Sequence, residues 1–217
     1  MKLQEERNEL VKYGKLIIQA GLTKGTGGNF SIYNRKEKLM AITPSGIPYM
    51  VMRPEEIVIM DLHGNIVEGD LIPSSEHEMH ATVYREREDA NAMIHIHSTF
   101  CTTLSALNEP LPAVDYLVAF SGGKEVKCAE YATYGTPELA ANAMKAMGKQ
   151  NAVLLANHGL NVVAGSMMMA LAIAEQIEFC AEVYIRARSA GAPVILSEEE
   201  MTMMVKRFAN YGQRKEG

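Results

Sequence analysis

The stretch Ala92-Met-Ile-His-Ile-His-Ser98 predicts a β-strand, because β-branched and apolar residues alternate with other residues at a period of two. Residues i and i+2 of a strand point to the same face of a sheet. We therefore expect His95 and His97 to project together from one face, and Ile94 and Ile96 from the other. Two imidazoles side by side on a rigid strand are suited to ligate a metal; the alternative is a structural pair held by hydrogen bonds.

A third ligand is needed, since catalytic zinc sites usually take three protein ligands and leave one position open. His158 follows the apolar run that begins at Ala152 and precedes Gly159, where the backbone can turn sharply. We favour His158 as this ligand; a histidine satisfied by hydrogen bonds at a strand end is the alternative. Imidazole ligands suit zinc, and also iron, nickel, cobalt and manganese.

Glu76 is the preferred acid/base candidate, because it lies directly after Ser74-Ser75 at the start of a predicted helix. Ser75 and Glu78 have the spacing of a capping box, which predicts a helix over 75–87. The alternative role for Glu76 is a charge that complements the helix dipole, worth at most about 1 kcal/mol.

Three short segments are suited to bind an anion: Gly25-Thr-Gly-Gly-Asn29, Ser45-Gly46 and Ser74-Ser75. Glycines let backbone N–H groups converge, and a helix N-terminus adds unpaired donors. The first segment is neither a Walker loop nor G-x-G-x-x-G, and an ordinary turn is its alternative. Together with the histidines, these segments suggest a phosphorylated small molecule at a metal. A divalent metal can act as a Lewis acid in C–C cleavage of a ketose phosphate, while a carboxylate moves the proton.

The whole chain predicts an α/β fold in one domain, residues 1–217, because no Pro/Ser-rich linker divides it. Hairpins outnumber βαβ units, so we expect a mostly antiparallel sheet with helices on its faces. Helices are expected over 4–20, 75–87, 99–107, 136–148, 167–190 and from 197 onward. Strands are expected over 30–33, 39–43, 57–62, 66–68, 92–98, 125–129 and 152–156, and again after the turn at 157–159.

Composition narrows the partners and the compartment. The net charge of −5 and the pI of about 5.7 argue against nucleic acid or an anionic membrane as the main partner. The apolar-rich run 152–174 is interrupted by polar residues and glycines, so no membrane span is expected there. The first ten residues contain no apolar signal-peptide region. Three isolated cysteines suggest reduced thiols and a cytoplasmic location.

Seven motifs occur in order along residues 5–212: Gly25-Thr-Gly-Gly-Asn29, Thr43-Pro-Ser-Gly46, Pro73-Ser-Ser-Glu76, His95-Ile-His97, Tyr131-Ala-Thr-Tyr-Gly-Thr136, Asn157-His-Gly159 and Tyr211-Gly212. This ordered set resembles the class II aldolase/epimerase family, and most of all its members that cleave L-fuculose 1-phosphate. The resemblance implies a three-layer α/β/α sandwich around a mostly antiparallel sheet. It also implies a C4 homotetramer with the active site at the subunit interface.

The resemblance assigns roles to individual residues. It implies one zinc ion per subunit held by His95, His97 and His158. Glu76 would be a fourth, displaceable ligand and the proton-transfer residue. The phosphate of dihydroxyacetone phosphate would be held by Gly28, Asn29, Ser45, Gly46, Ser74 and Ser75.

Three tyrosines match family positions around the aldehyde. Tyr116 matches the tyrosine that reaches over from a neighbouring subunit to protonate the aldehyde oxygen, and Tyr134 and Tyr211 match positions that shape the aldehyde end. The implied reaction is zinc-dependent, reversible cleavage of a 1-phospho-ketose of the L-fuculose 1-phosphate type to dihydroxyacetone phosphate and a small aldehyde, L-lactaldehyde.

Three alternatives stay open. Tyr134 stands where fuculose enzymes typically have Phe, and the run 113–123 resembles 5-deoxyribulose-1-phosphate aldolases, which release acetaldehyde. Ribulose-phosphate 4-epimerases use the same retro-aldol chemistry, but place Asp where this chain has Glu76. A non-enzymatic module like the adducin head is the third alternative, although a scaffold needs no metal.

Overall fold

An eight-stranded sheet in the order β4-β3-β2-β1-β5-β8-β7-β6 forms the middle layer of the computed structural model, which describes residues 1–208. Every pairing between these strands is antiparallel except that of β6 with β7. The expectation of a mostly antiparallel sheet is therefore confirmed. The strands are β1 Asn29–Asn34, β2 Leu39–Ile42, β3 Val58–Met60, β4 Ile66–Glu68, β5 Ala92–Ile96, β6 Cys128–Ala129, β7 Ala152–Leu155 and β8 Gly159–Ala164.

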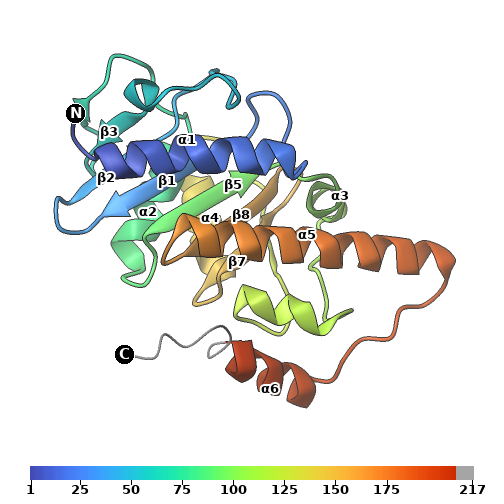
Figure 1. The fold of residues 1–217 in the computed structure, drawn as a ribbon. Coiled ribbons are helices and arrows are strands. Elements are labelled where there is room, and N and C mark those ends of the chain that lie inside the picture. The colour runs from blue at the N-terminus through green and yellow to red at the C-terminus, as the bar shows by residue number, and fades with distance from the viewer. Residues whose placement is uncertain (209–217) are drawn as a thin grey trace, which may run out of the picture.

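Helices cover both faces of the sheet (Figure 1). One apolar cluster joins the sheet to α1, α3, α5 and α6, and a second cluster joins its other face to α2 and α4. This arrangement is the predicted α/β/α sandwich. The helices are α1 Gln4–Gln19, α2 His77–Glu86, α3 Thr99–Leu107, α4 Pro137–Met147, α5 Met167–Ala190 and α6 Glu198–Phe208, with short 3₁₀ helices η1 Pro54–Glu56 and η2 Tyr116–Ser121.

Strand β5 lies at the centre of the sheet between β1 and β8, and all five of its residues are buried. Ile94 and Ile96 pack into the cluster under α1, α3 and α5, while Met93 packs into the cluster under α2 and α4. The predicted alternation is thus present. Since His95 has the parity of Met93, its side chain leaves the sheet on the α2 and α4 side.

The predicted start of the second helix is wrong. Helix α2 begins at His77 with Glu76 as its N-cap residue, and no side chain caps it. The expected partner in the capping box, Glu78, instead accepts hydrogen bonds from Thr82 and Arg85, at 3.2 and 2.5 Å, farther along the same helix. Ser75 therefore stays in the preceding turn, and the Glu76 carbonyl accepts a hydrogen bond from the Met79 N–H at 3.0 Å.

Other helix starts follow their sequence signals. The Thr136 hydroxyl accepts from the Leu139 N–H at the start of α4, and the Ser166 hydroxyl accepts from the Met169 N–H at the start of α5. The strand expected over 125–129 shrinks to two residues, Cys128–Ala129. Within residues 1–208, no helix combines the length and apolar character that crossing a bilayer requires.

Candidate active site

Three imidazoles meet at the end of the central strands. His95 belongs to β5, His97 follows β5 directly, and His158 lies in the turn between β7 and β8. Their candidate ligand nitrogens all lie within 4.8 Å of one another, and the Nε2 atoms of His95 and His97 are 3.0 Å apart. The structure thus brings together the three histidines that the sequence singled out.

Two glycines allow this approach, because a side chain at either position would clash with the backbone of β5 or the residue after it. An added Cβ at Gly159 would meet the carbonyl oxygen of Ile96. An added Cβ at Gly28 would meet the carbonyl oxygen of His95, and Gly28 also has a φ of +74°. Such close approach and positive φ are what glycine permits. The loops that carry His158 and Asn29 can therefore close onto the end of β5.

The Glu76 carboxylate completes the cluster. Its Oε2 lies 3.3 Å from Nε2 of His95, and its Oε1 lies 3.7 Å from Nε2 of His158. Glu76 is only 5% exposed, and Oε1 has no hydrogen-bond partner among the described residues. Buried carboxylate oxygens are normally satisfied. A buried carboxylate with one oxygen that lacks a donor, beside a cluster of three imidazoles, fits a divalent cation with one carboxylate and three imidazole ligands.

The protonation states agree with that use. Burial first, and then the neighbouring His158 and His97, lower the pKa of His95 well below its ordinary value of 6.5. Burial and His158 also lower the pKa of His97. Neutral imidazoles have a free nitrogen lone pair, which is the form that binds a metal.

Asn161 orients His95, and sequence reasoning missed it. Oδ1 of Asn161 lies 2.8 Å from Nδ1 of His95, which it faces across the β5–β8 pairing. The amide nitrogen of Asn161 points instead to the sulfur of Met79, at 3.0 Å. Nδ1 of His95 therefore carries the proton and Nε2 is free to face the cluster. The available signal was a polar residue in an otherwise apolar strand.

The two serine-containing loops lie side by side. The Ser74 N–H donates to the Thr43 carbonyl at 3.1 Å, and the Ser45 N–H donates to the Ile72 carbonyl at 2.9 Å. Ser45 Oγ also donates to the carbonyl of Pro73 at 3.1 Å. Ser74 Oγ accepts from the N–H of Glu76 at 3.3 Å. The two serine-containing loops are therefore linked by a hydrogen bond to the candidate metal ligand Glu76.

The Asn29 side chain is engaged within the protein. Its amide nitrogen donates to Glu76 Oε2 at 2.9 Å, and its Oδ1 lies 2.6 Å from Nε2 of His80. Asn29 also pairs with His95 in the β1–β5 register. Three predicted site residues are thus in direct contact, and His80 joins them from α2.

Tyr134 and Tyr116, which are predicted to lie around the aldehyde, share no hydrogen bond with this network within residues 1–208. Tyr134 is 66% exposed, and the next residue, Gly135, packs against the carbonyl of Ser75. Tyr116 is 49% exposed, and its ring stacks on Phe208 with centroids 6.2 Å apart. Tyr211 lies outside the described residues. No contact within residues 1–208 joins Tyr116 to the histidines.

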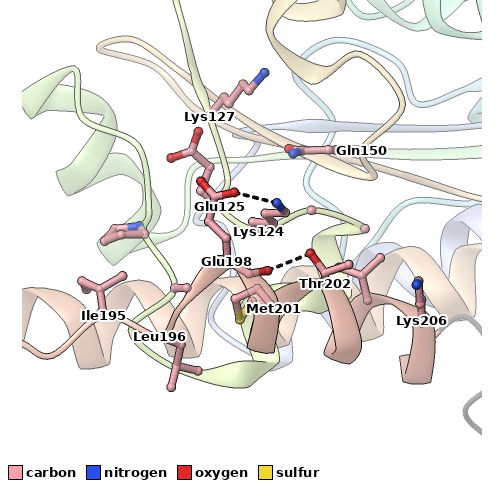
Figure 2. A pocket seen from close by; sticks show the side chains of 15 residues that line it. Lys124, Glu125, Lys127, Gln150, Ile195, Leu196, Glu198, Met201, Thr202 and Lys206 are labelled. Atoms are coloured by element: carbon pink, nitrogen blue, oxygen red, sulfur yellow. Dashed lines mark hydrogen bonds and ion pairs between the residues drawn. The ribbon is translucent and has the colours of Figure 1, made fainter.

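A separate cavity of about 630 Å³ lies between the 122–127 loop and α6 (Figure 2). Lys127 and Gln150 are on one side of it, and Met201 and Thr202 of α6 are on the other. None of the residues that line this cavity is a predicted site residue. The cavity is therefore distinct from the histidine cluster.

Comparison with known proteins agrees with this geometry. Residues 8–185 match the family described as the class II aldolase and adducin N-terminal domain. The chain is 51% identical over 214 residues to a 5-deoxy-D-ribulose 1-phosphate aldolase of Bacillus thuringiensis serovar kurstaki, covering 99% of this chain and 100% of the relative. It is 41% identical over 201 residues to the L-fuculose phosphate aldolase of Escherichia coli K12, covering 92% of each.

A solved structure of an L-fuculose 1-phosphate aldolase superimposes with a TM-score of 0.92 at 50% identity, covering 94% of this chain and 96% of that one. A structure of YgbL from Klebsiella pneumoniae, a putative aldolase/epimerase/decarboxylase by its description, superimposes with a TM-score of 0.84 at 25% identity, covering 94% and 99%. The family match spans well over half of the sequence. The chain therefore belongs to the class II aldolase and adducin N-terminal domain family.

Proposed function

We propose that the protein is a zinc-dependent class II aldolase that cleaves a 1-phospho-ketose reversibly to dihydroxyacetone phosphate and a small aldehyde. The observation that carries this proposal is the buried Glu76 carboxylate, one oxygen of which lacks a donor, beside the cluster of His95, His97 and His158. His95, His97 and His158 would hold the ion with Glu76 as a displaceable fourth ligand. When bound, a divalent ion supplies Lewis-acid stabilisation of the enediolate that forms on C–C cleavage.

The residues around the ion have complementary tasks. Glu76 moves the proton to and from the carbon of dihydroxyacetone phosphate, and its burial keeps water away from that transfer. Residues of the paired serine loops and of the glycine loop bind the phosphate. Those residues are Gly28, Asn29, Ser45, Gly46, Ser74 and Ser75. Tyr116 protonates the aldehyde oxygen of a neighbouring site, and Tyr134 and Tyr211 shape the aldehyde end.

The substrate we favour is 5-deoxyribulose 1-phosphate, which releases acetaldehyde. The sequence by itself points first to L-fuculose 1-phosphate, but a relative that is 51% identical and covers 99% of this chain is a 5-deoxy-D-ribulose 1-phosphate aldolase. L-Fuculose 1-phosphate is the second candidate, since a structure at 50% identity carries that name. A tyrosine hydroxyl at Tyr134 also distinguishes this pocket from the phenylalanine expected of fuculose enzymes.

We further propose a cytoplasmic C4 homotetramer of one-domain subunits. The exposed ring of Tyr116 supports an active site completed across a subunit interface. Analytical ultracentrifugation tests the assembly, and a mixture of Tyr116→Phe subunits with Glu76→Gln subunits tests the shared site. Restored turnover in mixed tetramers is expected if each site takes its two residues from different chains. Mixtures as inactive as either parent would contradict that sharing.

The decisive experiment is a condensation panel. Dihydroxyacetone phosphate is offered with acetaldehyde, L-lactaldehyde and glycolaldehyde, and kcat/KM is compared. We expect acetaldehyde to lead; a lead for L-lactaldehyde would establish the second candidate. Chelation should abolish turnover, and zinc should restore it. Turnover without metal, together with inactivation by borohydride and substrate, would instead show a Schiff-base lysine.

Product analysis separates the remaining alternatives. Free aldehyde identifies an aldolase, whereas a ketose inverted at C4 identifies an epimerase. Absence of both products, with no metal bound after expression in zinc-replete medium, would indicate a structural module.

A further inference from the structure

A chain of buried side chains runs from α2 to the Glu76 carboxylate. The hydroxyl of Tyr84 lies 2.7 Å from Oγ of Ser31 and 3.0 Å from the carbonyl oxygen of the same residue. Ser31 Oγ lies 2.6 Å from Nδ1 of His80, and His80 Nε2 lies 2.6 Å from Oδ1 of Asn29. The Asn29 amide nitrogen then lies 2.9 Å from Glu76 Oε2. All five residues are at most 5% exposed, so water does not substitute for a missing partner.

The Glu76 carboxylate, at one end of this series of side chains, fixes the direction of the hydrogen bonds along it. An ionised carboxylate only accepts, so the Asn29 amide must turn its N–H toward Glu76 and its carbonyl oxygen toward His80. Nε2 of His80 must then carry the proton and donate it to that oxygen. Nδ1 of His80 is left without a proton and accepts from the Ser31 hydroxyl. The Tyr84 hydroxyl donates to the oxygens of Ser31, so each donor in this series has an acceptor.

We propose that His80 is a positioning residue for the aldolase reaction: as its Nε2–H tautomer it locks the Asn29 amide in the one orientation that donates to Glu76. This inference rests on the proposed function, because it assigns Glu76 the proton-transfer role. The ring of His80 contacts Ser31 and Asn29, so its effect on Glu76 passes through the Asn29 amide.

The alternative orientation shows why the lock matters. If His80 carried its proton on Nδ1, Nε2 would present a lone pair to Asn29, and the amide would rotate to donate to it. Oδ1 of Asn29 would then face the Glu76 carboxylate, and two acceptors would lie at hydrogen-bond distance. Burial lowers the pKa of His80 to about 3, so the imidazole is neutral at pH 7 and has only one N–H to place. The position of the single ring proton of His80 therefore decides whether Asn29 turns a donor or an acceptor toward the Glu76 carboxylate.

Two variants separate this role from simple packing. In His80→Gln, the side-chain amide can still donate an N–H from the position of Nε2. In His80→Leu, a side chain of similar size offers no donor. We expect His80→Leu to lower kcat by about 10-fold to 100-fold, the usual effect of losing an orienting partner beside a metal site. His80→Gln should recover most of that loss, and both variants should bind one zinc ion per subunit. Equal activity of the two variants would overturn the proposal. His63→Gln, an exposed histidine, controls for effects of substitution in general.

A spectroscopic measurement tests the same claim without activity. ¹⁵N NMR of the full chain labelled in histidine, with and without zinc, distinguishes the two tautomers by the shifts of the ring nitrogens. We expect the His80 resonance to show a protonated Nε2 and an unprotonated Nδ1 in both states. A protonated Nδ1 would overturn the proposal, even if His80→Leu did not fold. If the unsubstituted protein cleaved no ketose phosphate, the proposed function would fail, while the spectrum would still decide the tautomer.

Discussion

Nδ1 of His95 donates a 2.8 Å hydrogen bond to Oδ1 of Asn161, its cross-strand neighbour on β8. The bond fixes both the tautomer and the ring orientation of a fully buried imidazole, and directs Nε2 toward His97 and Glu76. The pairing register of two strands thus determines which nitrogen of His95 can bind a metal.

Removing this acceptor should weaken metal binding. We expect Asn161→Val to lower zinc affinity by about 10-fold to 100-fold, because Nδ1 of His95 loses its buried partner and the ring loses its orientation. Competition with a chromogenic chelator measures the affinity. Asn161→Asp is the matched control, since it keeps an acceptor at the same place. An unchanged affinity in Asn161→Val would show that packing alone orients the ring.

Glu76→Gln should separate metal binding from proton transfer. We expect the variant to retain zinc, which the three histidines hold, and to lose about 10²-fold to 10⁴-fold in kcat, as is usual for removing a general acid or base. Metal analysis and steady-state kinetics measure the two effects. Loss of zinc and of the folded state together would instead make Glu76 a structural residue.

Two glycines with positive φ should respond differently to alanine. Gly25 has a φ of +62° and nothing within 4 Å of an added Cβ, so Gly25→Ala should cost only the left-handed backbone penalty of about 1–2 kcal/mol. Gly28→Ala carries that penalty and also clashes with the His95 carbonyl. We expect a clearly larger loss of unfolding free energy in chemical denaturation, and weaker zinc binding. Equal losses for the two variants would mean that the Gly28 loop can move away from β5 freely.

The side chain of Glu178 caps helix α3 from another element. Its carboxylate accepts from Ser98 Oγ at 2.6 Å and from the N–H groups of Phe100 and Cys101 at 2.8 and 2.9 Å. Replacing it with Gln removes the charge and one acceptor, so we expect Glu178→Gln to lose about 1–2 kcal/mol of unfolding free energy. The control is Glu175→Gln, because Glu175 is an exposed residue on α5, the helix that also carries Glu178. Its unfolding free energy is expected within about 0.5 kcal/mol of the parent's. Matching stabilities of the two variants would contradict the cap.

The metal-free protein should lose stability in mild acid. The pKa of His80 falls from 6.5 to about 3 on folding, through burial and then the neighbouring His95. At pH values between about 6.5 and 3, His80 is protonated in the unfolded chain and neutral in the folded chain. The unfolding free energy therefore decreases as pH falls through this range. The slope is at most about 1.4 kcal/mol per pH unit for this group. Denaturation at pH 7 and pH 5 measures it, and His80→Gln should show a shallower slope. Identical slopes in the two proteins would show that His80 does not contribute.

Much of the site could be predicted from residue type and spacing. The period of two along 92–98 placed His95 and His97 together, and the glycine after His158 indicated the turn that returns it to the same edge. Glu76 was singled out by its place after two serines, although the predicted capping box did not form. The three histidines come together as predicted because strand alternation and turn chemistry act over a few residues.

The partners of those residues depended on tertiary contacts. Asn161 reaches His95 only through the β5–β8 register, His80 reaches Glu76 only through Asn29 on β1, and Glu178 caps α3 from a helix 77 positions away in sequence. A single sequence contains the chemistry of each side chain, but not which distant strand or helix it will face. The sequence determined which residues could bind a metal and move a proton. The packed sheet decided the tautomers, the amide orientation and the caps, because each depends on partners that only folding brings within hydrogen-bond distance.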